Sequence, residues 1–196
     1  MPTDERIARV TSVLSFRQPD LRVVLEDVTN THNANAVLRT CDAAGVLNVD
    51  IITAAGEPLP INKAITTRAD KWLELRYHPS AAVCLRDLKE RGFFIAATDL
   101  GPAAAPYDSI DYARPTAIVF GNEKEGLSAA ALERADVRIR VPMHGMVQSL
   151  NLSVSVGIIL YEALRQRALR GRSESSRLSP EELEACRRKW LEPSRE

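Results

Sequence analysis

The stretch VPMHGMVQSLNLSVSVGIIL, residues 141–160, leads from a short apolar run into a long apolar helix through a polar loop. A turn of this kind needs only a glycine and a capping residue, yet this one also holds Gln148, Ser149 and Asn151. A glycine-containing loop between apolar side chains presents backbone N–H and C=O groups beside apolar walls, as small-ligand pockets do. Alone this indication is weak, because Met143 and Met146 also suit gap filling in a core.

The chain around this loop has the size and composition of one folded domain. Its 196 residues suffice for one buried core, with 45% hydrophobic and 27% charged residues. The 26 basic and 26 acidic residues cancel, so net charge indicates neither a nucleic-acid nor a membrane partner. Between Arg165 and Arg177, however, five arginines stand against one acidic residue, Glu174. This local excess predicts either a phosphate-binding surface or a solvated helix end.

Cysteine usage and the first residues favour a cytoplasmic protein. Cys41, Cys84 and Cys186 are odd in number and widely spaced, which fits a reducing compartment better than a disulfide framework. The start MPTDERIARV contains acidic residues and no long apolar segment, so no secretory signal is expected. No run approaches the roughly 18 apolar residues of a membrane span, and no membrane partner is expected.

Short apolar segments alternate with segments of helical periodicity, which predicts an α/β fold with a mostly parallel sheet flanked by helices. In such sheets ligands bind beyond the carboxyl ends of the strands. The site is therefore expected in the loops after Asp27, Asp99, Phe120 and Val141. The expected strands are 21–27, 49–53, 72–78, 93–99, 116–120 and 137–141.

Helices are expected between these strands and at both ends of the chain. One runs from Asn33, as N-cap, to the residue before Gly45, and the last opens with Ser179 as cap and Glu182 at the capping-box position. The other expected helices are 61–69, 80–92, 128–135 and 150–170. The predicted organisation is an amino-terminal helical extension, 1–20, a core, 21–170, and a carboxyl-terminal helical extension, 171–196.

Common nucleotide and metal motifs are incomplete. The loop GNEKEGLS after 116–120 nearly matches the phosphate-binding pattern G-x-x-x-x-G-K-[ST], but Leu127 stands where the lysine belongs. No G-x-G-x-x-G follows a strand. A nucleotide triphosphatase and a dinucleotide enzyme are therefore disfavoured, and the two glycines alone predict a tight turn. His32, His78 and His144 have no partner at ligand spacing, so no metal site is expected.

HNANAVLRT, residues 32–40, places Asn33 and Arg39 six positions apart, which alone fits a helix cap and a surface arginine. Together with FGNEKEGLS (120–128) and VPMHGMVQSLNLSVSVGIILYEALRQR (141–167), it resembles the three signature motifs of the SPOUT superfamily of RNA methyltransferases. The resemblance is closest to the TrmH branch, which methylates the ribose 2′-hydroxyl of tRNA guanosine 18. Further similar segments, such as RQPDL and IDYARPTAIVFGNEKEG, extend it over roughly 17–170.

This resemblance implies a SPOUT-type fold whose carboxyl-terminal segment is threaded into a deep trefoil knot that forms the S-adenosylmethionine site. It also implies a homodimer in which each active site draws on both subunits, and a chemistry that requires no metal. Cofactor contacts are then expected from three loops, at Thr98, Leu100, Gly101, Gly121, Val141, Met143, Gly145 and Leu150.

The resemblance also assigns catalytic positions. In the implied reaction the ribose 2′-hydroxyl takes the methyl group from a sulfonium, and positioning of the reactants alone can lower the barrier by roughly 7–11 kcal/mol. Arginine is effectively always protonated, and deprotonating Arg39 near neutrality would cost roughly 7 kcal/mol. We therefore expect Arg39 to fix a phosphate and stabilise the developing alkoxide, with a neutral Arg39 base as the alternative. The assigned positions are Asn33, Arg39, Glu123, Ser149 and Asn151.

RNA binding is expected to rest on phosphate contacts and shape, because aromatic residues are only 5% of the chain. The chain departs from close relatives at TTRAD (66–70), before Lys71 and Trp72, and at Asn35, where a small residue is usual. These departures leave another tRNA or ribosomal ribose as an alternative target. A non-catalytic RNA-binding dimer of the same fold is an alternative function, although Asn33, Arg39, Glu123 and Asn151 together argue against it. A small-molecule enzyme with a nucleotide cofactor is a third, disfavoured by the missing lysine and glycine motifs. The expected RNA contacts are Arg6, Arg9, Arg17, Arg165, Arg167, Arg170 and Arg172.

Overall fold

The computed structural model describes residues 2–53, 58–171 and 177–192, and its strands form one seven-stranded sheet. The strand order is β3-β2-β1-β6-β4-β7-β5, and all neighbouring strands run parallel. The expected α/β fold is therefore confirmed. The strands are β1 (Gln18–Glu26), β2 (Val46–Ile52), β3 (Glu74–His78), β4 (Phe94–Thr98), β5 (Ala105–Pro106), β6 (Thr116–Phe120) and β7 (Val137–Arg140).

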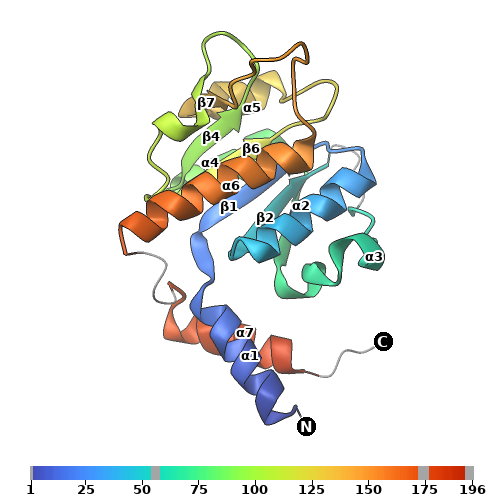
Figure 1. Ribbon diagram of the computed structural model, residues 1–196, viewed down its shortest axis with the longest axis vertical. Helices are drawn as coiled ribbons and strands as arrows, with labels where there is room; N and C mark the ends of the chain where they lie inside the picture. Colours follow the sequence, from blue (N-terminus) through green and yellow to red (C-terminus); the bar gives the residue numbers. More distant parts are fainter. Residues whose placement is uncertain (1, 54–57, 172–176, 193–196) are drawn as a thin grey trace.

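Helices cover both faces of this sheet (Figure 1). On one face lie α2 (Thr31–Ala43) and α6 (Leu152–Leu169), and on the other lie α4 (Ala81–Glu90) and α5 (Ala129–Arg134). The remaining helical elements are α1 (Asp4–Ser15), α3 (Lys63–Thr66), the 3₁₀ turns η1 (Ala69–Trp72) and η2 (Tyr107–Ser109), and α7 (Pro180–Leu191).

Strand β1 runs through the middle of the sheet and carries apolar side chains on both faces. Leu21, Val23 and Leu25 belong to the core formed with α2 and α6, whereas Val24 belongs to the core formed with α4 and α5. This division follows from strand geometry, in which successive side chains point to opposite faces. Because helices cover both faces, the strand reads as a continuous apolar run.

Element boundaries differ from the expected ones where polar residues obscure the pattern. β1 begins at Gln18 rather than at residue 21, and its pairing with β2 is irregular up to Arg22. Asn33 does not cap α2. The helix begins at Thr31, and the Asn30 side chain accepts a hydrogen bond of 3.2 Å from the Asn33 N–H. The trefoil knot stays a prediction.

The first and last helices pack together at the end of the sheet where the strands begin (Figure 1). The expected capping box opens α7, because Ser179 Oγ accepts from the Glu182 N–H and the Glu182 carboxylate accepts from the Ser179 N–H. No helix in the described ranges combines the length and apolarity needed to cross a bilayer. The shared core consists of Val10, Leu14, Leu47, Leu178, Cys186 and Trp190.

Candidate active site

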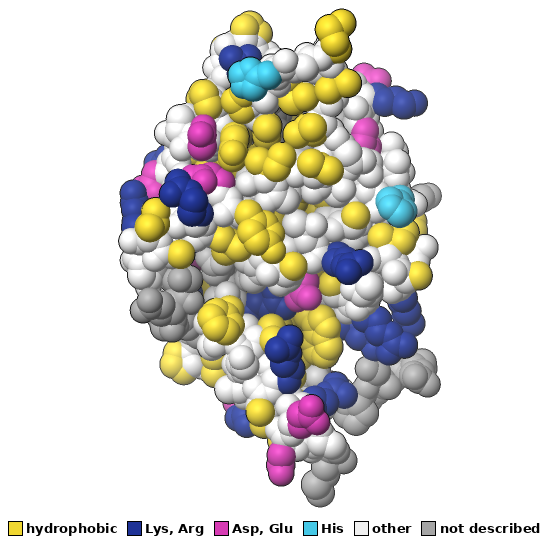
Figure 2. Space-filling view, in the orientation of Figure 1, with side chains coloured by type: hydrophobic (Ala, Val, Ile, Leu, Met, Phe, Trp, Pro, Cys, Tyr) yellow, Lys and Arg dark blue, Asp and Glu magenta, His cyan; other side chains and the backbone are white. Residues whose placement is uncertain are grey.

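A cavity of about 490 Å³ lies at the carboxyl ends of β4, β6 and β7, where the sequence places the site. In Figure 2 hydrophobic side chains gather over the upper part of the molecule, where these strands end. Most of the expected cofactor and catalytic residues meet here. Those that line the cavity are Asn33, Thr98, Leu100, Gly121, Glu123, Val141, Met143, Ser149, Leu150 and Asn151.

Three expected site residues lie outside this lining. Gly101 is turned to Asp99, whose carboxylate accepts its N–H at 3.0 Å, and Gly145 lies in open space. Arg39 lines a second cavity of about 450 Å³, together with His32, Thr40 and residues of α3 and α6. Arg39 therefore lies in a different cavity from the other expected catalytic residues.

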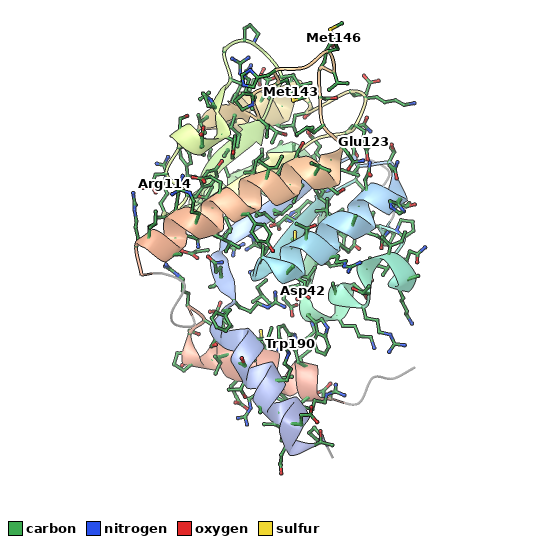
Figure 3. The ribbon with its side chains drawn as sticks, in the orientation of Figure 1. Asp42, Arg114, Glu123, Met143, Met146 and Trp190 are labelled. Atoms are coloured by element: carbon green, nitrogen blue, oxygen red, sulfur yellow. The ribbon has the colours of Figure 1, made fainter. Side chains whose placement is uncertain are left out.

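Three side chains distant in sequence form a hydrogen-bonded chain at the rim of the first cavity. Asn33 Nδ2 donates to Glu123 Oε1 at 3.1 Å, and Asn151 Nδ2 donates to Asn33 Oδ1 at 2.9 Å. Asn151 also caps α6, because its Oδ1 accepts from the N–H and the hydroxyl of Ser153. In Figure 3 Glu123 lies beside the amino end of α6, with Met143 nearby and Met146 at the outer tip of the loop. The chain of bonds fixes α2, the loop after β6 and α6 relative to one another.

The loop after β6 is the tight turn that its two glycines predict. Asn122 and Gly126 exchange two backbone hydrogen bonds of 3.0 Å, and the Asn122 side chain accepts from the N–H groups of Lys124 and Glu125. A Cβ on Gly121 would lie 2.3 Å from the Gly126 carbonyl carbon. Only glycine therefore permits this close approach, which brings the turn back against the cavity wall.

Several residues of the cavity carry charge that the sequence analysis did not select. Asp99, Lys124, Glu125 and Arg140 line it, and each stands at the end of an expected strand or in the loop after one. Their position after a strand is the signal that identifies them. With Glu123, the cavity has three carboxylates against two cations, which favours a cationic ligand.

The wall of the second cavity depends on Asn35, one of the departures from the family pattern. This buried side chain donates to the carbonyls of Thr31 and Pro60, at 2.7 and 2.9 Å, and accepts from the Asn62 N–H at 2.8 Å. All of its polar atoms are satisfied. Asn35 thus fixes the segment that leads into α3, whose Ala64 faces the cavity of Arg39.

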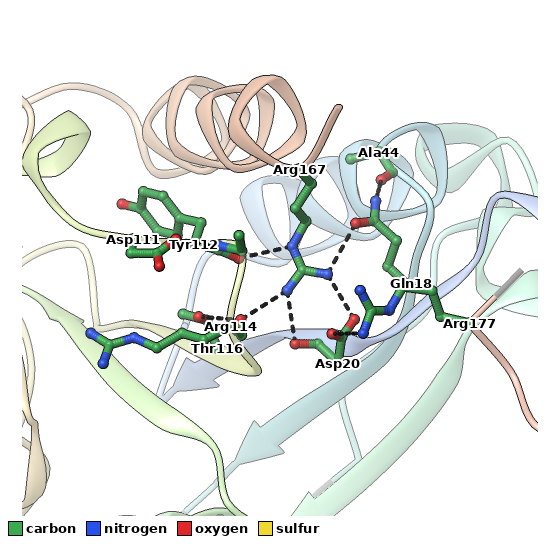
Figure 4. A network of polar contacts seen from close by, with 10 residues as sticks. Gln18, Asp20, Ala44, Asp111, Tyr112, Arg114, Thr116, Arg167 and Arg177 are labelled. Carbon is green, nitrogen blue, oxygen red and sulfur yellow. Dashed lines mark hydrogen bonds and ion pairs between the residues drawn. The ribbon is translucent and has the colours of Figure 1, made fainter. Parts of the chain in front are cut away.

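Arg167 does not have the exposed position expected of an RNA contact, because it is fully buried. Figure 4 shows the polar contacts of its guanidinium. Its guanidinium donates to Asp20 Oδ1 at 2.7 Å and to Gln18 Oε1 at 3.1 Å. It also donates to the backbone carbonyls of Asp20, Tyr112 and Arg114. A buried charge is tolerated here because the guanidinium is hydrogen-bonded to a carboxylate, an amide oxygen and three backbone carbonyls.

Arg17 is the second correction to the expected RNA contacts. It is 1% exposed, pairs with the Asp42 carboxylate and donates to the Val46 carbonyl at 2.9 Å. Its guanidinium lies 5.0 Å from the Trp190 ring of α7. Arg17 therefore joins the helical extension to the core.

The other expected RNA contacts that the structure describes are exposed, but two of them form ion pairs. Arg6 and Arg9 are exposed on α1, and Arg165 and Arg170 are exposed on or after α6, where they pair with Glu162 and Asp111. The hydrogen bond from Arg165 is the largest cause that lowers the pKa of Glu162. The pKa of Asp111 is also lowered, mainly by the hydrogen bond from the Ala113 N–H and to a lesser extent by Arg170. Arg172 lies outside the described residues.

One group of potential metal ligands forms in three dimensions although its sequence spacing gives no sign of it. Ligand atoms of Asp50, His78 and Cys84 lie within 4.8 Å of one another. The buried Arg22 already pairs with Asp50 at 2.8 Å, and burial raises the pKa of the Cys84 thiol well above its usual range. A cation bound to the carboxylate and a protonated thiol do not suit a metal site. The group is a buried ion pair.

Comparison with known proteins places the chain among RNA-modifying enzymes. Residues 20–161 match the model of the SpoU rRNA Methylase family. A tRNA (guanosine(18)-2'-O)-methyltransferase of Thermus thermophilus is 46% identical over 96% of this chain and 97% of its own length. The crystal structure of the A. aeolicus TrmH/SpoU tRNA modifying enzyme gives a TM-score of 0.92 at 42% identity, over 96% of this chain and 95% of that one.

A more distant structure was determined with a cofactor. The AdoMet-bound rRNA methyltransferase from Sinorhizobium meliloti gives a TM-score of 0.65 at 27% identity. It covers 80% of this chain and 59% of that one. The same core is therefore present in a protein that binds S-adenosylmethionine.

Proposed function

The chain belongs to the SpoU rRNA methylase family, and on this basis we propose that it transfers a methyl group from S-adenosylmethionine to the 2′-hydroxyl of guanosine 18 in tRNA. The observation that carries the proposal is the hydrogen-bonded chain of Asn33, Glu123 and Asn151 at the rim of a cavity. The tRNA target comes from the Thermus thermophilus relative, which matches over nearly the whole chain. The free cysteines of the described chain fit a cytoplasmic location.

The first cavity suits S-adenosylmethionine in size and chemistry. Its volume of about 490 Å³ lies within the range of roughly 300–1,000 Å³ that is usual for small-ligand sites. Leu127, Leu132 and Ile139 provide apolar wall for an adenine ring. Asp99 and Glu123 provide negative charge for a ligand that carries a sulfonium and an ammonium group.

When bound, S-adenosylmethionine supplies a methyl group on a sulfonium, which is already an activated leaving group. In the proposed reaction the methyl group would pass from the sulfonium to the ribose 2′-oxygen, S-adenosylhomocysteine would leave, and the hydroxyl proton would go to solvent. Asn33 and Asn151 are held rigidly by each other and by Glu123, so they can orient the ribose without a rearrangement. Ser149 lines the same cavity beside them.

We propose that Arg39 supplies the positive charge that this reaction needs. Its side chain is exposed and has no ion-pair or hydrogen-bond partner within the described ranges. It is thus available to bind an RNA phosphate and to stabilise the negative charge that develops on the 2′-oxygen.

The separation of Arg39 from the first cavity supports the homodimer. Helix α6 carries apolar side chains on its outer side as well as toward the core, because Val154 and Tyr161 are about half exposed. The loop beside it exposes Met146 and Val147. A second copy that covers these side chains would bring Arg39 of one subunit toward the methyl donor of the other.

The test is methyl transfer to defined RNA. Unmodified tRNA and ribosomal RNA are incubated with labelled S-adenosylmethionine, and the label is mapped by nuclease digestion. We expect label on the ribose of guanosine 18, and none on a tRNA whose residue 18 carries a 2′-deoxyribose. Label on ribosomal RNA alone would assign the enzyme to the alternative target, and tight tRNA binding without transfer would assign a binding module.

A further inference from the structure

Helix α3 is a single turn whose position depends on tertiary contacts. Isolated helices shorter than about 12–15 residues are marginal in water, and α3 has only four residues. It lies beside α2 (Figure 1). Ala64 and Ile65 of this turn line the cavity that contains Arg39. The contacts that hold α3 therefore also set one wall of that cavity.

Asn35 of α2 holds the segment that enters α3. Its side chain is fully buried, and Nδ2 donates to the Pro60 carbonyl at 2.9 Å while Oδ1 accepts from the Asn62 N–H at 2.8 Å. Asn62 in turn caps α3, because its Oδ1 accepts from the Ala64 N–H at 3.0 Å. A continuous series of hydrogen bonds thus runs from α2 to the wall of the cavity.

The far end of α3 is held as well. Thr66 is buried, and its hydroxyl donates to Asp70 at 2.7 Å and accepts from the Arg68 N–H at 3.1 Å. Thr67 and Arg68 both adopt left-handed conformations, with φ of 51° and 66°. Residues other than glycine keep such conformations where surrounding contacts impose them. The turn is therefore fixed at both ends, and its first end is bonded to the helix that carries Arg39.

Asn35 and Arg39 stand one turn apart on α2, so their side chains are neighbours along the helix. His32, Ala36 and Thr40 line the cavity of Arg39 from the same helix. Arg39 itself is exposed and has no ion-pair or hydrogen-bond partner among the residues that the structure describes. The direction of its guanidinium therefore depends on the surfaces around it, and α3 is one of them.

We infer that Asn35 is a positioning residue for methyl transfer, which holds α3 in place and through this wall directs Arg39 toward the RNA. The inference rests on the proposed function of Arg39. A wall that is fixed before the substrate binds spares the reaction a rearrangement. The first cavity is held by other bonds, those among Asn33, Glu123 and Asn151. Loss of the Asn35 contacts should therefore slow transfer without weakening the binding of S-adenosylmethionine.

The experiment measures two quantities on the full-length protein: the affinity for S-adenosylmethionine, by calorimetry, and the rate of a single turnover with saturating unmodified tRNA. For Asn35→Ala the rate is expected to fall about tenfold or more, since a misplacement near 1 Å can cost about 10²-fold. The dissociation constant of S-adenosylmethionine should stay within about twofold. The matched control is Leu85→Ala, which opens a cavity in the core on the other face of the sheet. This control should lower the melting temperature but leave the rate within about twofold of the wild type.

A double-mutant cycle tests whether Asn35 acts through Arg39. In a protein that already carries Arg39→Ala, the further change Asn35→Ala should slow transfer by less than about twofold, because two residues that act together are not additive. If the two losses multiply in full, Asn35 does not act through Arg39 and the inference is wrong.

Asn62 allows the same test without a change in the core. Asn62→Ala removes the cap of α3 at an exposed position, so the rate should fall about threefold with little change in the melting temperature. Asn62→Ser keeps a capping oxygen and should recover most of the rate. If Asn35→Ala does not fold, this pair decides, and a wild-type rate for Asn62→Ala overturns the inference.

Three other results would also overturn it and leave the proposed function standing. They are a wild-type rate for Asn35→Ala, an equal loss of rate in Leu85→Ala, and a loss of donor affinity that matches the loss of rate. A wild-type protein that transfers no methyl group to tRNA would overturn the proposed function itself.

Discussion

Asn151 and Asn33, separated by 118 positions in sequence, are joined by a hydrogen bond of 2.9 Å between Nδ2 and Oδ1. The same Asn151 caps α6 through its Oδ1, and the same Asn33 donates to Glu123. One amide pair therefore sets the distance between α2 and α6 and the position of the carboxylate at the cavity rim.

Asn151→Asp separates these two roles. Aspartate still caps α6, because its carboxylate accepts from the Ser153 N–H, but it cannot donate to Asn33. We expect kcat/KM to fall about 10²-fold, the cost of a misplacement near 1 Å, with a melting temperature close to that of the wild type. Asn30→Asp, a matched change at the cap of α2, should retain activity. Equal rates for the two variants would contradict the role of the bond.

Gly121→Ala should open the turn after β6. The new Cβ would lie 2.3 Å from the Gly126 carbonyl carbon and 2.5 Å from the Leu127 nitrogen. Both are backbone atoms, so the turn itself would have to move to relieve the clash. Binding of S-adenosylmethionine, measured by calorimetry, is expected to weaken at least about tenfold. In Gly126→Ala, in the same turn, the new Cβ meets no atom within 4 Å. The only cost is that of a non-glycine residue at a φ of 71°, on the order of 1 kcal/mol. Its effect on binding should therefore be the smaller of the two.

Arg167→Met tests whether this residue supports the fold rather than contacts RNA. The change leaves the Asp20 carboxylate and three backbone carbonyls without their buried donor. We expect the free energy of unfolding, from urea titration, to fall by about 3–5 kcal/mol. The exposed neighbour Arg165→Ala should change it by less than about 0.5 kcal/mol. A stable Arg167→Met protein with weakened tRNA binding would restore the expected contact.

The buried thiols predict a loss of stability in alkali. Burial is the largest cause that raises the pKa of Cys41 and of Cys84, so both stay protonated in the folded protein while the unfolded chain ionises above about pH 8.5. The unfolded state then binds fewer protons, and stability falls as pH rises, by up to about 1.4 kcal/mol per pH unit for each thiol.

Urea midpoints between pH 7.5 and 10 measure this slope. The Cys41→Ala/Cys84→Ala variant has a lower midpoint at pH 7.5, because it leaves two cavities, but its midpoint should decline less steeply. Parallel slopes for the two proteins would exclude the thiols as the cause.

The sequence predicts the sheet and the loops of the site because both depend on local patterns. Strand β6 is placed at its observed bounds, and the loops that contain Thr98, Gly121 and Val141 line one cavity as expected. The resemblance supplies Asn33, Glu123 and Asn151, but their hydrogen bonds depend on how three segments pack. The burial of Arg17 and Arg167 also depends on tertiary packing, since an arginine is expected to be exposed until its buried partners are known.

The bond between Asn33 and Asn151 can form only late in the synthesis of the chain. Asn33 is made early and Glu123 midway, whereas Asn151 stands at the start of the last helix of the core. A ribosome must therefore translate the chain at least through Asn151 before the rim of the first cavity can close. A nascent chain that ends before Asn151 lacks this rim, however much of its sheet has already folded.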